Sequence, residues 1–168
     1  DKKFNRALYG GHSGFRLETG DVPEFALFLP RMGGNLSFAI SNNNKRINLN
    51  DAKWTETRYR PAKRMYSITD PLLGKGRVEI EALALYEIEG GIWKITSHNI
   101  PKDIKLHITF GGASLTGFSR GGDMGVDPVD GFELKDKYCV GNKYDIHDNT
   151  FTLSFGADND QYLYGTLP

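Results

Sequence analysis

Residues 76–89 read Gly-Arg-Val-Glu-Ile-Glu-Ala-Leu-Ala-Leu-Tyr-Glu-Ile-Glu, and this stretch decides the fold class. Every second position is apolar, namely Val78, Ile80, Ala82, Ala84, Tyr86 and Ile88. A period of two residues puts these side chains on one face of a β-strand. The other face is charged towards both ends and apolar at Leu83 and Leu85. We therefore expect a long strand over 76–89, with one face in a core and the other covered only in the middle.

The same alternation recurs along the chain and predicts an all-β fold, with further strands at residues 35–40, 92–96, 104–110 and 151–155. Residues 25–29 are apolar throughout, too short for a helix and bracketed by Pro23 and Pro30, so a buried strand is expected there. Asparagines at 42–44 predict a hairpin turn within 35–50, and Gly90-Gly91 predicts a two-residue hairpin turn. Leu106 and Ile108 should share one strand face with Ile104 and Phe110.

No stretch of ten or more residues has helical periodicity. The expected architecture is one domain over residues 1–168, a two-sheet antiparallel β-sandwich. It should have at least about eight strands and no helix longer than about two turns. We expect the chain to be a fragment of a longer secreted protein, periplasmic or extracellular.

Charge and composition argue against several partners. The 168 residues contain 21 Lys and Arg and 21 Asp and Glu, so the formal net charge is zero. Nucleic acids and anionic membranes both select a basic excess, and neither is an expected partner. A local basic cluster at Arg58, Arg60, Lys63 and Arg64 is interpreted as solvated strand edges and loops. No apolar run approaches the roughly 18 residues of a membrane-spanning helix.

Residues 111–131 contain seven glycines and little apolar periodicity, which predicts a long loop and the first place to look for a site. In a glycan site, Arg120 and Asp123 would supply the polar contacts and Phe118 the apolar face. A structural Arg120–Asp123 ion pair is the alternative. Asp123, Asp127 and Asp130 are interpreted as turn-forming residues rather than calcium ligands, so no metal site is predicted.

Other chemistry-bearing residues give weaker signals. Glu79 and Glu81 share one strand face at a spacing that glycoside hydrolysis permits, yet charges on an open strand face need no such cause. Cys139 is the lone cysteine, and its distance from His147 along the chain favours an idle thiol. Core packing explains Trp93, whereas Trp54 follows a polar stretch and is a candidate for stacking on a sugar ring. No cofactor is expected.

Several longer segments resemble an uncharacterised domain family near the N-terminus of large glycoside hydrolases from gut polysaccharide-degrading bacteria. The resembling segments cover nearly the whole chain and are residues 5–10 (NRALYG), 15–21 (FRLETGD), 23–27 (PEFAL), 31–36 (RMGGNL), 68–74 (ITDPLLG), 94–99 (KITSHN) and 118–123 (FSRGGD). The resemblance implies a supersandwich-like β-sandwich that precedes an α-helical toroid of the six-hairpin glycosidase kind. It implies catalytic carboxylates mainly beyond Pro168, and it assigns no catalytic residue within this chain.

Three functional hypotheses follow. The domain is an accessory sandwich that packs on a downstream catalytic domain and lends a loop to its glycan cleft, or a free-standing carbohydrate-binding module, or a small independent enzyme. An accessory domain should expose an apolar patch for its partner, whereas a binding module should expose an aromatic platform. An enzyme should gather titratable residues in one pocket. The sequence favours the first hypothesis.

Overall fold

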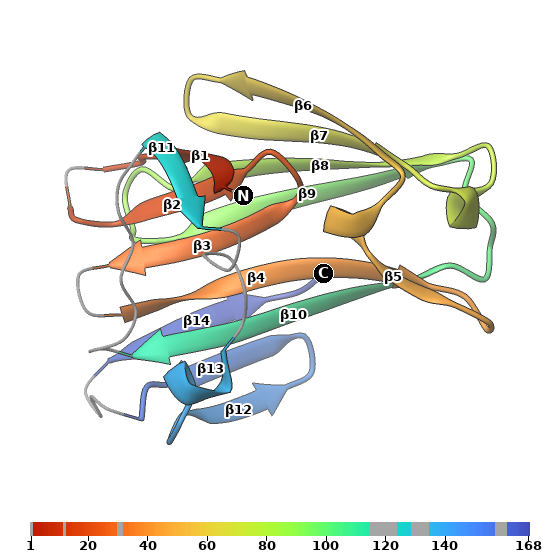
Figure 1. Cartoon of the computed structure of the whole chain (residues 1–168). Helices are drawn as coiled ribbons and strands as arrows, with labels where there is room; N and C mark the ends of the chain where they lie inside the picture. Colours follow the sequence, from red (N-terminus) through yellow and green to blue (C-terminus); the bar gives the residue numbers. More distant parts are fainter. Residues whose placement is uncertain (1, 12, 30–31, 115–123, 129–134, 157–160) are drawn as a thin grey trace.

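The described part of the chain consists mainly of antiparallel strands (Figure 1). The computed structural model describes residues 2–11, 13–29, 32–114, 124–128, 135–156 and 161–168. Within these ranges the helical segments are short 3-10 turns: η1 (Leu49–Asp51), η2 (Pro71–Leu73) and η4 (Asp136–Tyr138). The all-β prediction is therefore confirmed. No helix in the described part of the chain is long and apolar enough to cross a membrane.

One layer is a seven-stranded sheet with the strand order β10-β4-β3-β2-β1-β11. Short β5 (Arg46–Asn48) pairs with the end of β4 and lies off this path. The other members are β1 (Lys2–Leu8), β2 (Arg16–Gly20), β3 (Glu24–Leu29), β4 (Met32–Ser41), β10 (Lys105–Ser114) and β11 (Met124–Pro128). The β4–β5 turn confirms the predicted hairpin, since the Asn42 side chain accepts from the backbone N–H groups of Asn44 and Lys45.

The opposing layer begins with a four-stranded sheet of consecutive hairpins, in the order β6-β7-β8-β9. Its strands are β6 (Trp54–Arg60), β7 (Lys63–Thr69), β8 (Arg77–Ala84) and β9 (Gly91–His98). A third sheet has the order β12-β13-β14 and comprises β12 (Lys143–His147), β13 (Thr150–Ser154) and β14 (Tyr162–Thr166).

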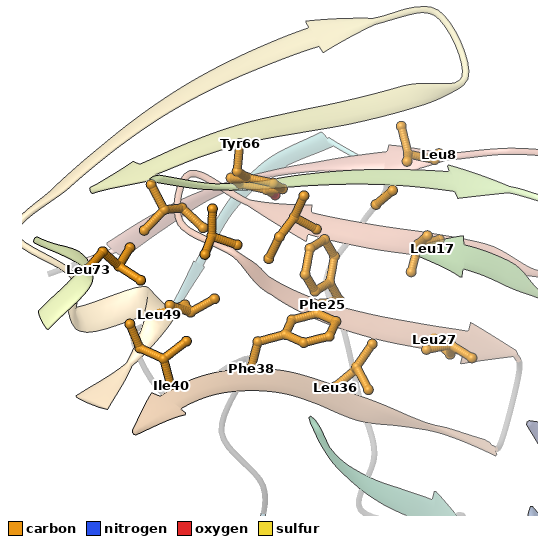
Figure 2. Close-up of a cluster of buried hydrophobic side chains, with 14 of the residues drawn as sticks. Leu8, Leu17, Phe25, Leu27, Leu36, Phe38, Ile40, Leu49, Tyr66 and Leu73 are labelled. Atoms are coloured by element: carbon orange, nitrogen blue, oxygen red, sulfur yellow. The ribbon is translucent and has the colours of Figure 1, made fainter. Parts of the chain in front are cut away.

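The main core lies between the seven-stranded and four-stranded sheets (Figure 2). The buried Phe25 ring at its centre makes edge-on contacts with Phe38, Tyr66 and Trp93, at centroid distances of 5.8, 5.6 and 5.8 Å. Trp93 thus packs against the core as predicted. Burial of each large apolar side chain contributes about 1.5–3 kcal/mol, so this cluster supplies the main driving force for stacking the two sheets.

The third sheet packs beside the four-stranded sheet on the same face of the seven-stranded sheet. Register places Phe110 opposite Leu36 and Gly112 opposite Gly34, so β10 turns these residues towards the core side. The Phe110 and Phe151 rings lie 6.4 Å apart. A Cβ atom at Gly112 would overlap Leu153, so glycine is needed for this close approach. The second layer therefore consists of two sheets, where the sequence predicted one.

The predicted strand over 76–89 is too long, because β8 ends at Ala84. Tyr86 and Ile88 are 72% and 66% exposed instead of lining the core. The turn is also wider than the predicted two residues, since Ala84 pairs with Gly91 and the Leu85 N–H donates to the Gly90 carbonyl. The backbone at residues 85–86 runs directly against that of Gly10 and Gly11. A Cβ atom at Gly10 would overlap the Leu85 carbonyl. This contact ends the regular ladder.

The prediction for residues 104–131 also needs correction at both ends. Leu106 and Ile108 share the core-side face as expected, but β10 is an edge strand and they remain 41% and 40% exposed. The supposed loop over 111–131 is partly strand, because β10 continues to Ser114 and residues 124–128 form β11 against β1. Glycines in strands usually lower strand propensity, and here they permit close sheet packing instead.

Candidate functional site

Three of the four predicted ligand-binding residues lie outside the described residues: Phe118, Arg120 and Asp123. Asp130 does as well, while Asp127 belongs to β11 and pairs in register with Lys3. Among the described residues, no group of three or more His, Cys, Asp and Glu side chains could hold a metal ion. The glycan site predicted in the glycine-rich segment stays a prediction.

Trp54, the fourth predicted residue, begins edge strand β6 and is 61% exposed. Its position is fixed from both sides. Asp70 caps η2 by accepting from Leu72 N, and the same carboxylate accepts from Lys53 N at 3.2 Å, one residue before Trp54. Trp54 pairs with Thr69 on the face opposite the buried Ile68. The indole is therefore presented to solvent on a well-anchored strand.

Trp54 shares this outer surface with four polar side chains, Thr69, Arg77, Glu79 and His98. We call this surface the Trp54 face. Adjacent strands lie about 4.8 Å apart, so Trp54 and Arg77, two strands away, are separated by about 10 Å at the backbone. Arg77 Nε donates to Glu79 Oε1 at 2.8 Å, and His98 Nε2 lies 3.1 Å from Glu79 Oε2. The result is an outer sheet surface with an aromatic ring at one edge and planar polar groups beside it.

The contacts of Glu79 and Glu81 argue against acid–base catalysis. The Arg77 and His98 hydrogen bonds lower the pKa of Glu79, against a small opposing effect of burial. A carboxyl with a lowered pKa stays ionised at neutral pH and is a poor general acid. Glu81 accepts from Lys63 Nζ at 2.8 Å. Each carboxylate thus has its own cation on the outer sheet face.

The predicted basic cluster separates into two kinds of residue. Lys63 and Arg58 form outer-face ion pairs with Glu81 and Glu56. Arg64 instead points to the core side, where its side chain is 6% exposed and lies 3.0 Å from Asp21. Alternation along β7 explains the difference, because Arg64 shares its face with Tyr66 and Ile68. Arg60 lies opposite Lys63 in the β6–β7 ladder, so only Arg64 of the four residues leaves the outer face.

Cys139 has the character of an idle thiol. Its sulfur donates to the Lys135 carbonyl at 3.8 Å, and burial, followed by the nearby Asp136 charge, raises the pKa of the thiol. His147 lies 3.2 Å from Asp145 on exposed β12. A raised pKa removes the thiolate that a nucleophile needs at neutral pH.

Sequence reasoning missed a set of polar side chains buried on the outer face of the seven-stranded sheet: Asn5, Glu18, Glu24 and Asn35, each at most 4% exposed. Arg16 Nε donates to Glu18 at 2.8 Å, and the Arg16 guanidinium lies 3.8 Å from the centre of the Phe28 ring. Burial of such groups is costly unless they are paired, so this set constrains the fold locally. The only available signal was the charged Arg16-Leu17-Glu18 spacing, which also fits an exposed strand.

The fold and surface define a class, an all-β sandwich domain with an aromatic and polar sheet face. The chain belongs to the family described as a domain of unknown function, DUF4450, which matches residues 29–166. No curated protein and no solved structure gives a significant match to the chain.

Proposed function

We propose that this domain is a non-catalytic accessory sandwich of a secreted glycoside hydrolase, packing on a downstream catalytic domain of the same chain. The sequence resemblance supports the enzyme class, and it favours a periplasmic or extracellular setting. The observation that carries the packing role is an apolar surface at the edge of the sandwich.

This surface, the open apolar edge, comprises Leu106, Ile108 and Ile146, which are 41%, 40% and 69% exposed. Leu106 and Ile108 point to the core side of β10, in register with the buried Ile40 and Phe38. Ile146 pairs with Phe151, the residue that contacts Phe110 of the same strand β10. Core-facing apolar side chains that stay exposed are typical of a surface that another domain covers.

A catalytic role for the domain itself has less support. Catalysis of glycoside hydrolysis requires one carboxyl that stays protonated near neutral pH beside another that is ionised. Glu79 has a lowered pKa with two partners, and Glu81 is paired with Lys63. The lowered pKa argues against Glu79 as the acid, and the Lys63 contact gives Glu81 a structural partner on the sheet face.

The Trp54 face supports the second candidate function, a carbohydrate-binding module. A sugar ring offers an apolar C–H face to an indole and hydroxyl groups to planar side chains such as Arg77 and Glu79. In an accessory domain the same face would hold a length of substrate beside the catalytic cleft.

The test is co-purification with the toroid domain encoded after residue 168 in the parent gene. The wild-type domain should co-purify with the toroid domain. The double substitution Leu106→Glu with Ile108→Glu should weaken this association strongly. Ile88→Glu, on the exposed 85–90 connection, is the matched control and should leave the association unchanged. A parent gene without a catalytic domain, or association unaffected by the double substitution, would refute the proposal.

A further inference from the structure

The outer face of the third sheet forms a second ordered surface, and β14 supplies its aromatic edge. Tyr162 and Tyr164 alternate with Leu163 and Gly165, whose positions face the interior. The two tyrosines are 53% and 74% exposed. Their ring centroids lie 6.4 Å apart with an angle of 27° between the planes. Two near-parallel, exposed rings therefore stand side by side along the strand.

The neighbouring strands add polar side chains in register with this strip. Ser154 and Thr152 of β13 lie opposite Tyr162 and Tyr164, so a row of hydroxyl side chains runs beside the rings. Beyond this row, Lys143 and Asp145 of β12 lie opposite Ser154 and Thr152. The surface thus changes from aromatic to hydroxyl to charged across three strands, and we call it the tyrosine face.

Packing of the third sheet does not require these tyrosines. Leu153 is fully buried, Leu163 packs against the main core, and the Tyr144 hydroxyl bonds to the backbone of Phe110 and Gly112. These groups all project from the inner face. Large aromatic side chains held exposed on a rigid sheet lose little conformational entropy on binding, which suits them to recognition.

The charges of the tyrosine face indicate the class of ligand. Lys143 and Asp145 have opposite signs, and His147 lies 3.2 Å from Asp145. A nucleic acid or another polyanion would select several unpaired cations, which these three strands do not provide. A neutral polysaccharide matches better, since its rings have apolar faces for the tyrosines and hydroxyl groups for Ser154, Thr152 and Asp145.

We propose that the tyrosine face is a glycan-binding platform for an extended neutral polysaccharide, separate from the Trp54 face. The proposal rests on the proposed function for its ligand class, and on the geometry of β14 for its location. Binding here would hold a polymer against the domain without any chemical step.

Affinity electrophoresis of the whole chain tests the platform, using native gels that contain hydroxyethylcellulose, xyloglucan, galactomannan, arabinoxylan, mixed-linkage β-glucan or soluble starch. We expect at least one polymer to retard the wild-type protein. The double substitution Tyr162→Ala with Tyr164→Ala should weaken that retardation at least about tenfold in apparent Kd, as expected from losing two stacking contacts. Tyr164→Phe should retain it, because the ring remains.

Two controls separate this inference from the proposed function. Tyr86→Ala removes a similarly exposed ring elsewhere and should leave retardation unchanged. Trp54→Ala tests the other face. The platform is refuted if no polymer retards the wild-type chain, or if the double tyrosine variant is retarded like wild type. If Trp54→Ala loses retardation and the double tyrosine variant keeps it, the platform is refuted and the accessory role is unaffected. If the domain fails to associate with the toroid domain, the accessory role is refuted and the platform is unaffected.

Discussion

Substitution of Tyr66 by phenylalanine should destabilise the domain at neutral pH and lose this effect in alkali. Tyr66 is 2% exposed, and its hydroxyl donates to the Gly20 carbonyl at 2.8 Å. Removal of a buried hydroxyl loses one hydrogen bond and leaves the Gly20 carbonyl with one partner fewer. The expected loss in free energy of unfolding is about 1–2 kcal/mol at pH 7.

The pH dependence follows from the raised pKa of the Tyr66 hydroxyl. Burial is the main cause of this rise, and Arg64 opposes it. A group whose pKa is raised by folding stabilises fully below its unfolded pKa, and its contribution is lost as pH rises towards the folded pKa. The unfolded pKa is about 10. At pH 11 the wild-type protein should therefore have lost about 1.4 kcal/mol through this one group.

Phenylalanine has no such ionisation, so the stability difference between the two proteins should shrink from about 1–2 kcal/mol at pH 7 to nearly zero at pH 11. Urea unfolding at pH 7, 9, 10 and 11, followed by tryptophan fluorescence, measures this difference. Other titrating groups cancel in the comparison. Tyr164→Phe, at a 74% exposed ring, serves as the control and should show no difference at any pH.

A difference that stays constant from pH 7 to pH 11 would refute the reasoning, because it would mean that Tyr66 ionises equally in the folded and unfolded states. A difference below about 0.5 kcal/mol at pH 7 would contradict the assigned Tyr66–Gly20 hydrogen bond.

Three further predictions concern other parts of the chain. Leu153→Ala should lower the free energy of unfolding by about 3–5 kcal/mol in urea, because this fully buried side chain packs against Gly112 of β10. A loss below about 1 kcal/mol would contradict that packing. Arg77→Ala should raise the pKa of Glu79 towards its ordinary value in an NMR titration, since Arg77 is the main cause of the lowering. Cys139 should react slowly with a thiol reagent at pH 7, and Asp136→Asn should modestly lower its pKa, so fast wild-type labelling would count against the burial of the thiol.

Local patterning was a reliable guide for several strands. The apolar run at residues 25–29 and the alternation at 35–40 were both predicted as strands and lie within β3 and β4. The register of Ile80 and Ala82 was likewise correct, and both are buried. In a strand such as β8, with one buried face, local patterning is sufficient because a shift of one residue would move every apolar side chain to the solvent side.

Long-range packing caused the errors. Tyr86 and Ile88 continue the alternation of β8, but the backbone contact with Gly10 and Gly11 interrupts the strand, and no local pattern reports that contact. Glycines at 111 and 112 resembled a loop, whereas Gly112 lies in β10 to admit Leu153.

The candidate surfaces were only partly predictable. Trp54 was identified from its polar neighbours, and the structure places it on an exposed sheet face. Its partners Arg77 and His98 come from strands β8 and β9, so their proximity depends on strand order rather than spacing in the chain. Tyr162 and Tyr164 alternate with Leu163 and Gly165, and this spacing could have been noticed, but nothing local distinguishes which face is solvated.

The pairing of β1 with β11 has a consequence for how the chain acquires its structure. Lys2 pairs with Pro128, so β1 cannot complete its ladder until residues near 128 have left the ribosome. The β6–β9 hairpins are local and can form much earlier. Non-local pairings of this kind slow folding, because the chain loses loop-closure entropy before any stabilising contact between the strands forms. The edge of β1 therefore stays unpaired until β11 has been made, and substitutions that weaken the β1–β11 ladder should increase aggregation during expression more than they reduce the stability of the folded domain.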